Sequence, residues 1–110
     1  MRDANYPWLI LVPALPGLRD LHDLPSDWSA TVMSEIKLAS AALVELFDPV
    51  KINVAALGNS VPQLHIHVIA RRTDDPAWPK PVWGAVPAVD YQEGALEQRV
   101  ADIKAILDAA

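Results

Sequence analysis

The chain has 110 residues, of which 52% are hydrophobic and 21% charged, and it contains no cysteine. This length suits one soluble domain with a single core, which we expect to span residues 1–110. Without cysteine, a disulfide scaffold and a thiolate metal site are excluded. The absence of cysteine also leaves no mark of an oxidising compartment, so we expect a cytoplasmic location. The formal net charge of −5 disfavours attraction to nucleic acid or to an anionic membrane, so we expect neither partner.

An apolar run at residues 6–18 is interrupted by three prolines, which excludes a membrane-spanning helix of about 20 uninterrupted residues. Its centre, residues 8–12, is bounded by prolines and predicts a short buried strand. Apolar residues then recur every three or four positions over residues 27–47, the spacing of an amphipathic helix. Ser26 is the predicted N-cap, and the Asp48–Pro49 step is the predicted end.

Two further strands are predicted at residues 52–57 and 64–70, joined through a turn at residues 58–60 into an antiparallel hairpin. The proline-rich segment 73–90 is expected to be an ordered loop whose tryptophans pack on the sheet or at an interface rather than stack on a base. Residues 96–107 carry a second helical stripe. The predicted fold class is therefore α+β, with an antiparallel sheet covered by two helices.

Polar residues alternate with apolar ones along the last predicted strand, which we expect to begin at Gln63. Alternation places Gln63, His65 and His67 on one face, opposite an apolar core face. Two imidazoles about 6–7 Å apart at the backbone can act on one bound group. Because imidazole titrates near neutral pH, one ring can be a neutral nucleophile while the other is a cation or a hydrogen-bond donor. This division suits covalent chemistry at a phosphoryl group.

Other polar residues offer weaker candidates. The His65–His67 pair could instead bind a metal ion, but no carboxylate follows until Asp74, so a metal-dependent enzyme is the less favoured alternative. Arg71 shares the predicted histidine face, where it would either contact a phosphate or be solvated. His22 lies in a polar loop and is expected to be exposed.

The residues from Gly58 to Arg71 resemble the signature of the histidine-triad (HIT) family. In that signature a glycine, an amide residue and Ser or Thr precede His-φ-His-φ-His-φ-φ, where φ is hydrophobic. The Leu11-Val12-Pro13 segment is similar to the family's hydrophobic–Val–Pro strand. The resemblance covers about residues 5–72, including the order of strand, helix, hairpin and histidine strand.

The resemblance implies a hydrolase or nucleotidyltransferase that acts on a nucleoside phosphate derivative, such as a dinucleoside polyphosphate or a phosphoramidate. It implies a homodimer that needs neither a metal nor another cofactor. His65 aligns with the middle histidine, which forms the covalent nucleotidyl intermediate, and His67 with the last, which supports the phosphate or orients its partner. Asn59 and Ser60 would contact the phosphates, and Asn53 would help to set the site.

Gln63 departs from the family pattern, because it stands where the first histidine of the triad is expected. Glutamine can form hydrogen bonds but cannot transfer a proton near neutral pH. We therefore expect an active enzyme, with a nucleotide-binding module that has lost catalysis as the alternative. Family members usually carry another strand or two before the equivalent of Asp3, so we expect either a late start or a sheet completed by a neighbour.

Overall fold

The computed structural model describes residues 1–110 and contains three strands and two α-helices. In chain order the elements are β1 (Trp8–Leu11), the 3₁₀ turn η1 (Leu21–Asp23), α1 (Ser26–Phe47), β2 (Lys51–Ala55), β3 (Ile66–Arg71) and α2 (Ala95–Ala109). The strands form one antiparallel sheet in the order β1-β3-β2, so β3 is central. The predicted α+β class, with an antiparallel sheet and two helices, is confirmed.

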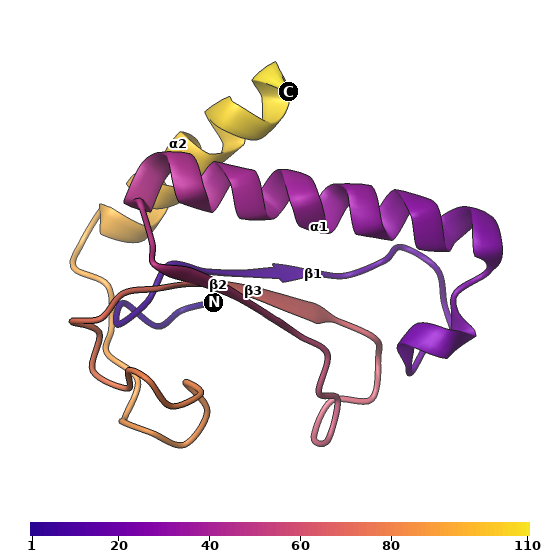
Figure 1. Cartoon of the computed structure of the whole chain (residues 1–110), viewed down its shortest axis with the longest axis horizontal. Helices are drawn as coiled ribbons and strands as arrows, with labels where there is room; N and C mark the ends of the chain where they lie inside the picture. The colour runs from indigo at the N-terminus through magenta and orange to yellow at the C-terminus, as the bar shows by residue number, and fades with distance from the viewer.

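One face of the sheet is covered by α1, on which α2 packs in turn (Figure 1). The helical stripe predicted from the sequence supplies this contact. The buried residues that the three elements contribute are Val32, Ala39 and Leu43 from α1, Ile66, Val68 and Ala70 from β3, and Ile103 from α2. Burial of these apolar side chains is the main driving force for docking the helices on the sheet.

On the opposite side of the sheet, the loop between β3 and α2, drawn in orange in Figure 1, lies against one end of the strands. Ala77 and Val82 of this loop pack with three residues of the sheet and its approach, Tyr6, Trp8 and Ile69. The expectation of a single core face on β3 is therefore wrong, since all six residues of the strand are buried. The prediction that the proline-rich loop packs on the sheet is confirmed.

Arg71 lies beneath this loop with only 1% of its surface exposed. Its guanidinium donates to both carboxylate oxygens of Asp75, at 2.8 and 3.1 Å, to Asn53 Oδ1 at 2.9 Å and to the Lys80 carbonyl at 2.8 Å. Both sequence interpretations of Arg71, phosphate contact and solvation, are wrong, because the loop supplies the guanidinium with a full set of acceptors. Arg71 instead ties the loop to β2 and β3.

Some predicted boundaries differ from the structure. Ser26 is the first residue of α1 rather than its N-cap; Pro25 occupies that position, without a side-chain hydrogen bond to the helix. The end of α1 agrees, with Asp48 in a left-handed conformation after Phe47. Neither helix combines the length and apolar character needed to cross a bilayer.

Candidate active site

The chain leaves the sheet after β2 and re-enters it only at Ile66, the first residue of β3. His65 therefore lies just outside the strand on which it was predicted. Only residues up to Ala55 of β2 pair with β3, and the last pair is Ala55 with His67. The amide N–H of Leu64 bonds to the carbonyl of Leu18 at 2.9 Å instead of to β2. This non-local contact ends the hairpin early and places His65 in an extended lead-in to the sheet.

The backbone around His65 determines which of its ring nitrogens carries a proton. Nδ1 of His65 lies 2.7 Å from the carbonyl oxygen of Gln63. A carbonyl can only accept, so Nδ1 must be the donor and hold the proton. In the neutral ring this leaves the lone pair on Nε2, which is the form needed for nucleophilic attack.

His67 has the opposite tautomer. The indole N–H of Trp8 donates to Nδ1 of His67 at 2.9 Å, and both side chains are buried. An indole N–H can only donate, so Nδ1 is unprotonated and the neutral ring carries its proton on Nε2. Burial, and then the charges of His65 and the N-terminal ammonium, lower the pKa of His67. His67 therefore favours the role of neutral hydrogen-bond donor over that of cation.

The two imidazoles lie side by side, as the sequence predicts, with ring centroids 5.0 Å apart and planes at 73°. The rings of Trp8 and Trp83 stand edge-on to His67, at centroid distances of 5.6 and 5.1 Å. One ring thus offers a lone pair and its neighbour an N–H. This pairing can serve attack at a phosphorus atom and hydrogen bonding to its oxygens.

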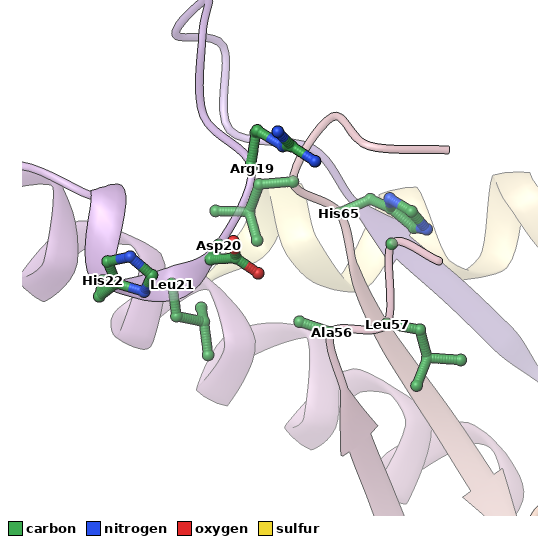
Figure 2. A pocket seen from close by; sticks show the side chains of 9 residues that line it. Arg19, Asp20, Leu21, His22, Ala56, Leu57 and His65 are labelled. Carbon is green, nitrogen blue, oxygen red and sulfur yellow. The ribbon is translucent and has the colours of Figure 1, made fainter. Parts of the chain in front are cut away.

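A pocket of about 300 Å³ opens beside His65 (Figure 2). Its walls come from the segment around η1, from the end of β2 and from the lead-in to β3. The lining residues are Arg19, Asp20, Leu21, His22, Ala56, Leu57, Gly58, Leu64 and His65. Arg19 gives the pocket a permanent cation, which a small anionic group could use despite the net negative charge of the chain.

The other residues predicted for the site lie at different distances from this pocket. Gln63 uses its backbone carbonyl to hold His65, while its half-buried side chain forms no hydrogen bond within the chain. Asn59 and Ser60 are exposed and directly follow Gly58, which lines the pocket. Asn53 is not brought to the pocket, because Arg71 Nη1 donates to its side-chain oxygen at 2.9 Å. The predicted substrate contacts of these residues stay predictions.

Sequence reasoning did not place three residues beside the histidines. Trp8 lies in the core, as predicted. Its hydrogen bond to His67 depends on the β1–β3 register, in which Trp8 pairs with Ile69. Arg19 reaches the pocket from a loop 46 positions before His65 in the sequence. Trp83 contacts the ring of His67 from the loop that follows β3, and its ring also lies 5.6 Å from that of Trp8. No local sequence pattern carries these long-range contacts.

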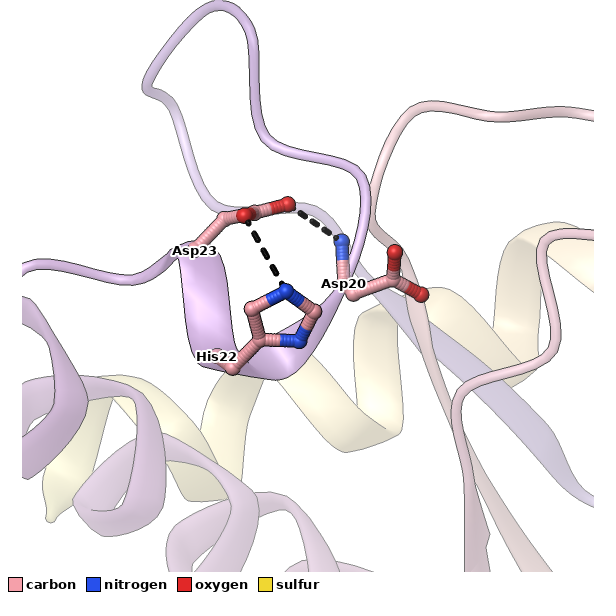
Figure 3. A group of neighbouring side chains, drawn as sticks. All are labelled: Asp20, His22 and Asp23. Atoms are coloured by element: carbon pink, nitrogen blue, oxygen red, sulfur yellow. Dashed lines mark hydrogen bonds and ion pairs between the residues drawn. The ribbon is translucent and has the colours of Figure 1, made fainter.

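The one cluster of three potential metal-ligating side chains is Asp20, His22 and Asp23, and all three are exposed (Figure 3). Asp23 accepts backbone N–H groups of Arg19 and Asp20, at 3.2 and 3.0 Å, and lies 3.6 Å from the ring of His22. These contacts account for the cluster as a stabilised turn. The prediction that His22 is exposed is confirmed.

Comparisons with known proteins agree on one family. The model of the HIT domain matches residues 1–74. The structure is similar to histidine triad protein blr8122 from Bradyrhizobium japonicum, with 44% identity and a TM-score of 0.94 over 97% of this chain and 80% of that chain. It is also similar to the HIT protein SMc02904 from Sinorhizobium meliloti 1021, with 42% identity and a TM-score of 0.92 over 96% and 78% of the two chains.

A third similar structure is a histidine triad protein from Marinobacter aquaeolei VT8, with 44% identity and a TM-score of 0.93 over 99% of this chain and 80% of that chain. Comparison with curated protein sequences gives no significant match. At these identities the likeness extends beyond the fold to the sequence, over 96–99% of this chain and 78–80% of the similar chains.

Proposed function

Because this chain belongs to the HIT-domain family, we propose that it is a nucleotide hydrolase or nucleotidyltransferase with His65 as its nucleophile. The substrate is a nucleoside phosphate derivative of the dinucleoside polyphosphate or phosphoramidate class. The observation that carries the proposal is the 2.7 Å hydrogen bond from His65 Nδ1 to the Gln63 carbonyl. It leaves the lone pair of the ring on Nε2 and holds the ring in one orientation.

In the first step, Nε2 of His65 attacks the phosphorus atom of the nucleotidyl group. A P–N bond forms as the bond from phosphorus to the leaving group breaks, and the leaving group departs with that electron pair and takes a proton from solvent. The ring of the intermediate is positively charged, and its Nδ1–H stays bonded to the Gln63 carbonyl, which stabilises the charge.

In the second step, water or another acceptor attacks the phosphorus atom. The P–N bond breaks and its electron pair returns to Nε2, while the proton of the attacking group passes to solvent. Gln63 cannot serve as an acid or base in either step, because an amide does not titrate near neutral pH. Leaving groups that depart without a protein acid should therefore react fastest.

The remaining predicted residues have supporting roles. Asn59 and Ser60 contact the phosphates from the loop beside the pocket, and Ser60 can donate its hydroxyl or its amide. Asn53 acts indirectly, since it holds Arg71 and through it the loop that brings Trp83 against His67. The enzyme functions as a homodimer, which light scattering on the purified protein would test.

Covalent trapping tests the nucleophile directly. Wild-type protein mixed with a fluorescent adenosine phosphoramidate or a diadenosine polyphosphate should gain one acid-labile adenylyl group on His65, located by mass spectrometry. His65→Asn should abolish the adduct and lower turnover at least about 10³-fold, as loss of a nucleophile does elsewhere. His22→Asn removes the other histidine that lines the pocket and should keep the adduct. Turnover that survives in His65→Asn would refute the proposal.

A nucleotide-binding module without catalysis is the second candidate, and the glutamine at position 63 is the observation that favours it. This candidate predicts micromolar nucleotide binding by calorimetry with no adduct and no turnover. Under it, Gln63→His should create turnover that the wild-type protein lacks. If the wild-type protein already turns over, the same substitution should change the rate without changing the site of the adduct.

A further inference from the structure

Trp8 holds His67 through a contact that the chemistry of His65 does not itself require. Trp8 and His67 are each 6% exposed, and the indole nitrogen lies 2.9 Å from Nδ1. The backbone fixes this approach, because β1 pairs with β3 in a register that sets Trp8 opposite Ile69 and Ile10 opposite His67. Trp8 therefore meets the ring of His67 diagonally across two paired strands.

The hydrogen bond has a chemical consequence for His67. If Nδ1 carried a proton, two N–H groups would face each other in a buried place and one hydrogen bond would be lost. This clash of two N–H groups would arise in the alternative neutral tautomer and also in the doubly protonated ring, so it disfavours both. The bond therefore selects the neutral tautomer with its N–H at Nε2, opposite to the tautomer that the Gln63 carbonyl selects in His65.

We infer that Trp8 is a positioning residue, whose indole N–H fixes the tautomer and orientation of His67 so that the imidazole presents an Nε2–H to the phosphoryl oxygens. This inference rests on the proposed function, because it takes the phosphoryl group of the His65 reaction as the acceptor. It adds a specific role for a residue that would otherwise count only as core. Trp8 itself does not touch the substrate.

Trp83 provides an internal comparison for this role. Its ring contacts His67 at 5.1 Å, slightly closer than the 5.6 Å of Trp8, and it is also edge-on. Trp83 forms no hydrogen bond to His67, whereas Trp8 does. A packing effect on His67 should therefore appear with either tryptophan, and a tautomer effect only with Trp8.

The first experiment measures the tautomer without any substrate. Long-range proton–nitrogen NMR spectra of the full chain, labelled with ¹⁵N-histidine, should show His67 with an unprotonated Nδ1 and a protonated Nε2 at neutral pH. Trp8 is then replaced by β-(3-benzothienyl)alanine, which keeps the shape of the side chain with sulfur in place of the N–H. His67 should shift toward a mixture of tautomers, and Trp83→Phe should leave it unchanged.

The second experiment measures kinetics on the same proteins. The isostere at position 8 should lower kcat about 10- to 100-fold, by analogy with the loss of groups that orient metal-binding imidazoles. KM should change little, because Trp8 does not contact the substrate. Trp8→Phe serves as a second variant that needs no unnatural amino acid, with circular dichroism to check the fold.

The outcomes separate this inference from the function on which it rests. A protonated Nδ1 in wild-type His67, or an isostere that leaves both the tautomer and kcat unchanged, would overturn the role of Trp8 while adduct formation on His65 could still stand. Equal tautomer shifts in the Trp8 and Trp83 variants would also overturn it, since packing alone would then explain the effect. Absence of an adduct on His65 would refute the proposed function, whatever the tautomer of His67.

Discussion

Removal of the buried guanidinium of Arg71 tests how the loop over the histidine face is held. Arg71 and its ionic partner Asp75 are 1% and 6% exposed at their side chains, and their closest atoms are 2.8 Å apart. We predict that Arg71→Met lowers the free energy of unfolding by about 3–5 kcal/mol, because methionine fills much of the space but leaves a buried carboxylate without its cation. This is a large part of the total stability of a typical domain, about 5–15 kcal/mol.

A neighbouring ion pair supplies the matched control. Arg72 and Asp74 are 3.0 Å apart, a similar distance, but their side chains are 54% and 73% exposed. Arg72→Met should cost no more than about 1 kcal/mol, because water screens an exposed pair and solvates the partner that remains. The same substitution at adjacent positions thus compares burial directly.

Urea unfolding followed by circular dichroism would measure both variants. Unchanged m-values would show that the comparison reports stability rather than a change in the unfolded state. Asp75→Asn combined with Arg71→Met should recover part of the loss, because the amide removes the unpaired charge while its oxygen can still accept backbone N–H groups. If Arg71→Met costs no more than Arg72→Met, the reasoning is refuted.

The pH dependence of the same difference follows from Asp75. Burial alone would raise the pKa of Asp75, but hydrogen bonds from the Arg71 side chain and from the amides of Arg72, Trp78 and Ala77 outweigh it and hold the pKa below its ordinary value. The stabilisation is therefore present above the unfolded pKa of about 4 and is lost as the pH falls through the folded value. The advantage of wild type over Arg71→Met should shrink in that acidic range.

Three further predictions concern the site and the core. Burial and nearby charges lower the pKa of His67, so the free energy of unfolding should fall as the pH drops below about 6.5, where the unfolded chain binds a proton that the folded ring does not. Urea titrations should show a smaller fall for His67→Phe, and an equal fall would contradict the assignment. Ser60→Ala should raise KM several-fold without changing stability if Ser60 contacts the phosphates, and unaltered kinetics would remove it from the site. Leu43→Ala, at a side chain that is fully buried against the sheet, should cost about 2–5 kcal/mol by urea unfolding, whereas Val44→Ala, at a position that is 48% exposed, should cost under about 1 kcal/mol; similar costs would contradict the assigned core.

Local patterns in the sequence were enough to predict much of the fold. The three- and four-residue spacing over residues 27–47 predicted α1 because one helical face is buried against β3. Prolines on both sides of residues 8–12 predicted β1 because they leave too little room for a helix. The side-by-side histidines followed from their spacing of two residues in an extended backbone.

The failed predictions depend on contacts between distant parts of the chain. His65 lies outside β3 because Leu64 bonds to Leu18, and no pattern near residue 64 indicates that partner. Arg71 is buried because the loop after β3 folds back over it and supplies Asp75 as its counterion. The hydrogen bond of Trp8 to His67 needs the pairing of strands whose partners are 59 residues apart. Register and loop path are set by tertiary packing, which the local sequence does not encode.

The early departure of the chain from the β2–β3 ladder determines which part of the chain holds the ring of His65. A carbonyl inside a sheet is already committed to a neighbouring strand, whereas the carbonyl of Gln63 lies outside the paired strands and can accept a hydrogen bond from Nδ1–H of His65. The group that orients this imidazole is therefore part of the main chain and is retained under any side-chain replacement that keeps the local path. Glutamine at position 63 can therefore hold the ring of His65 as a histidine there would, because only the backbone carbonyl of the residue is used.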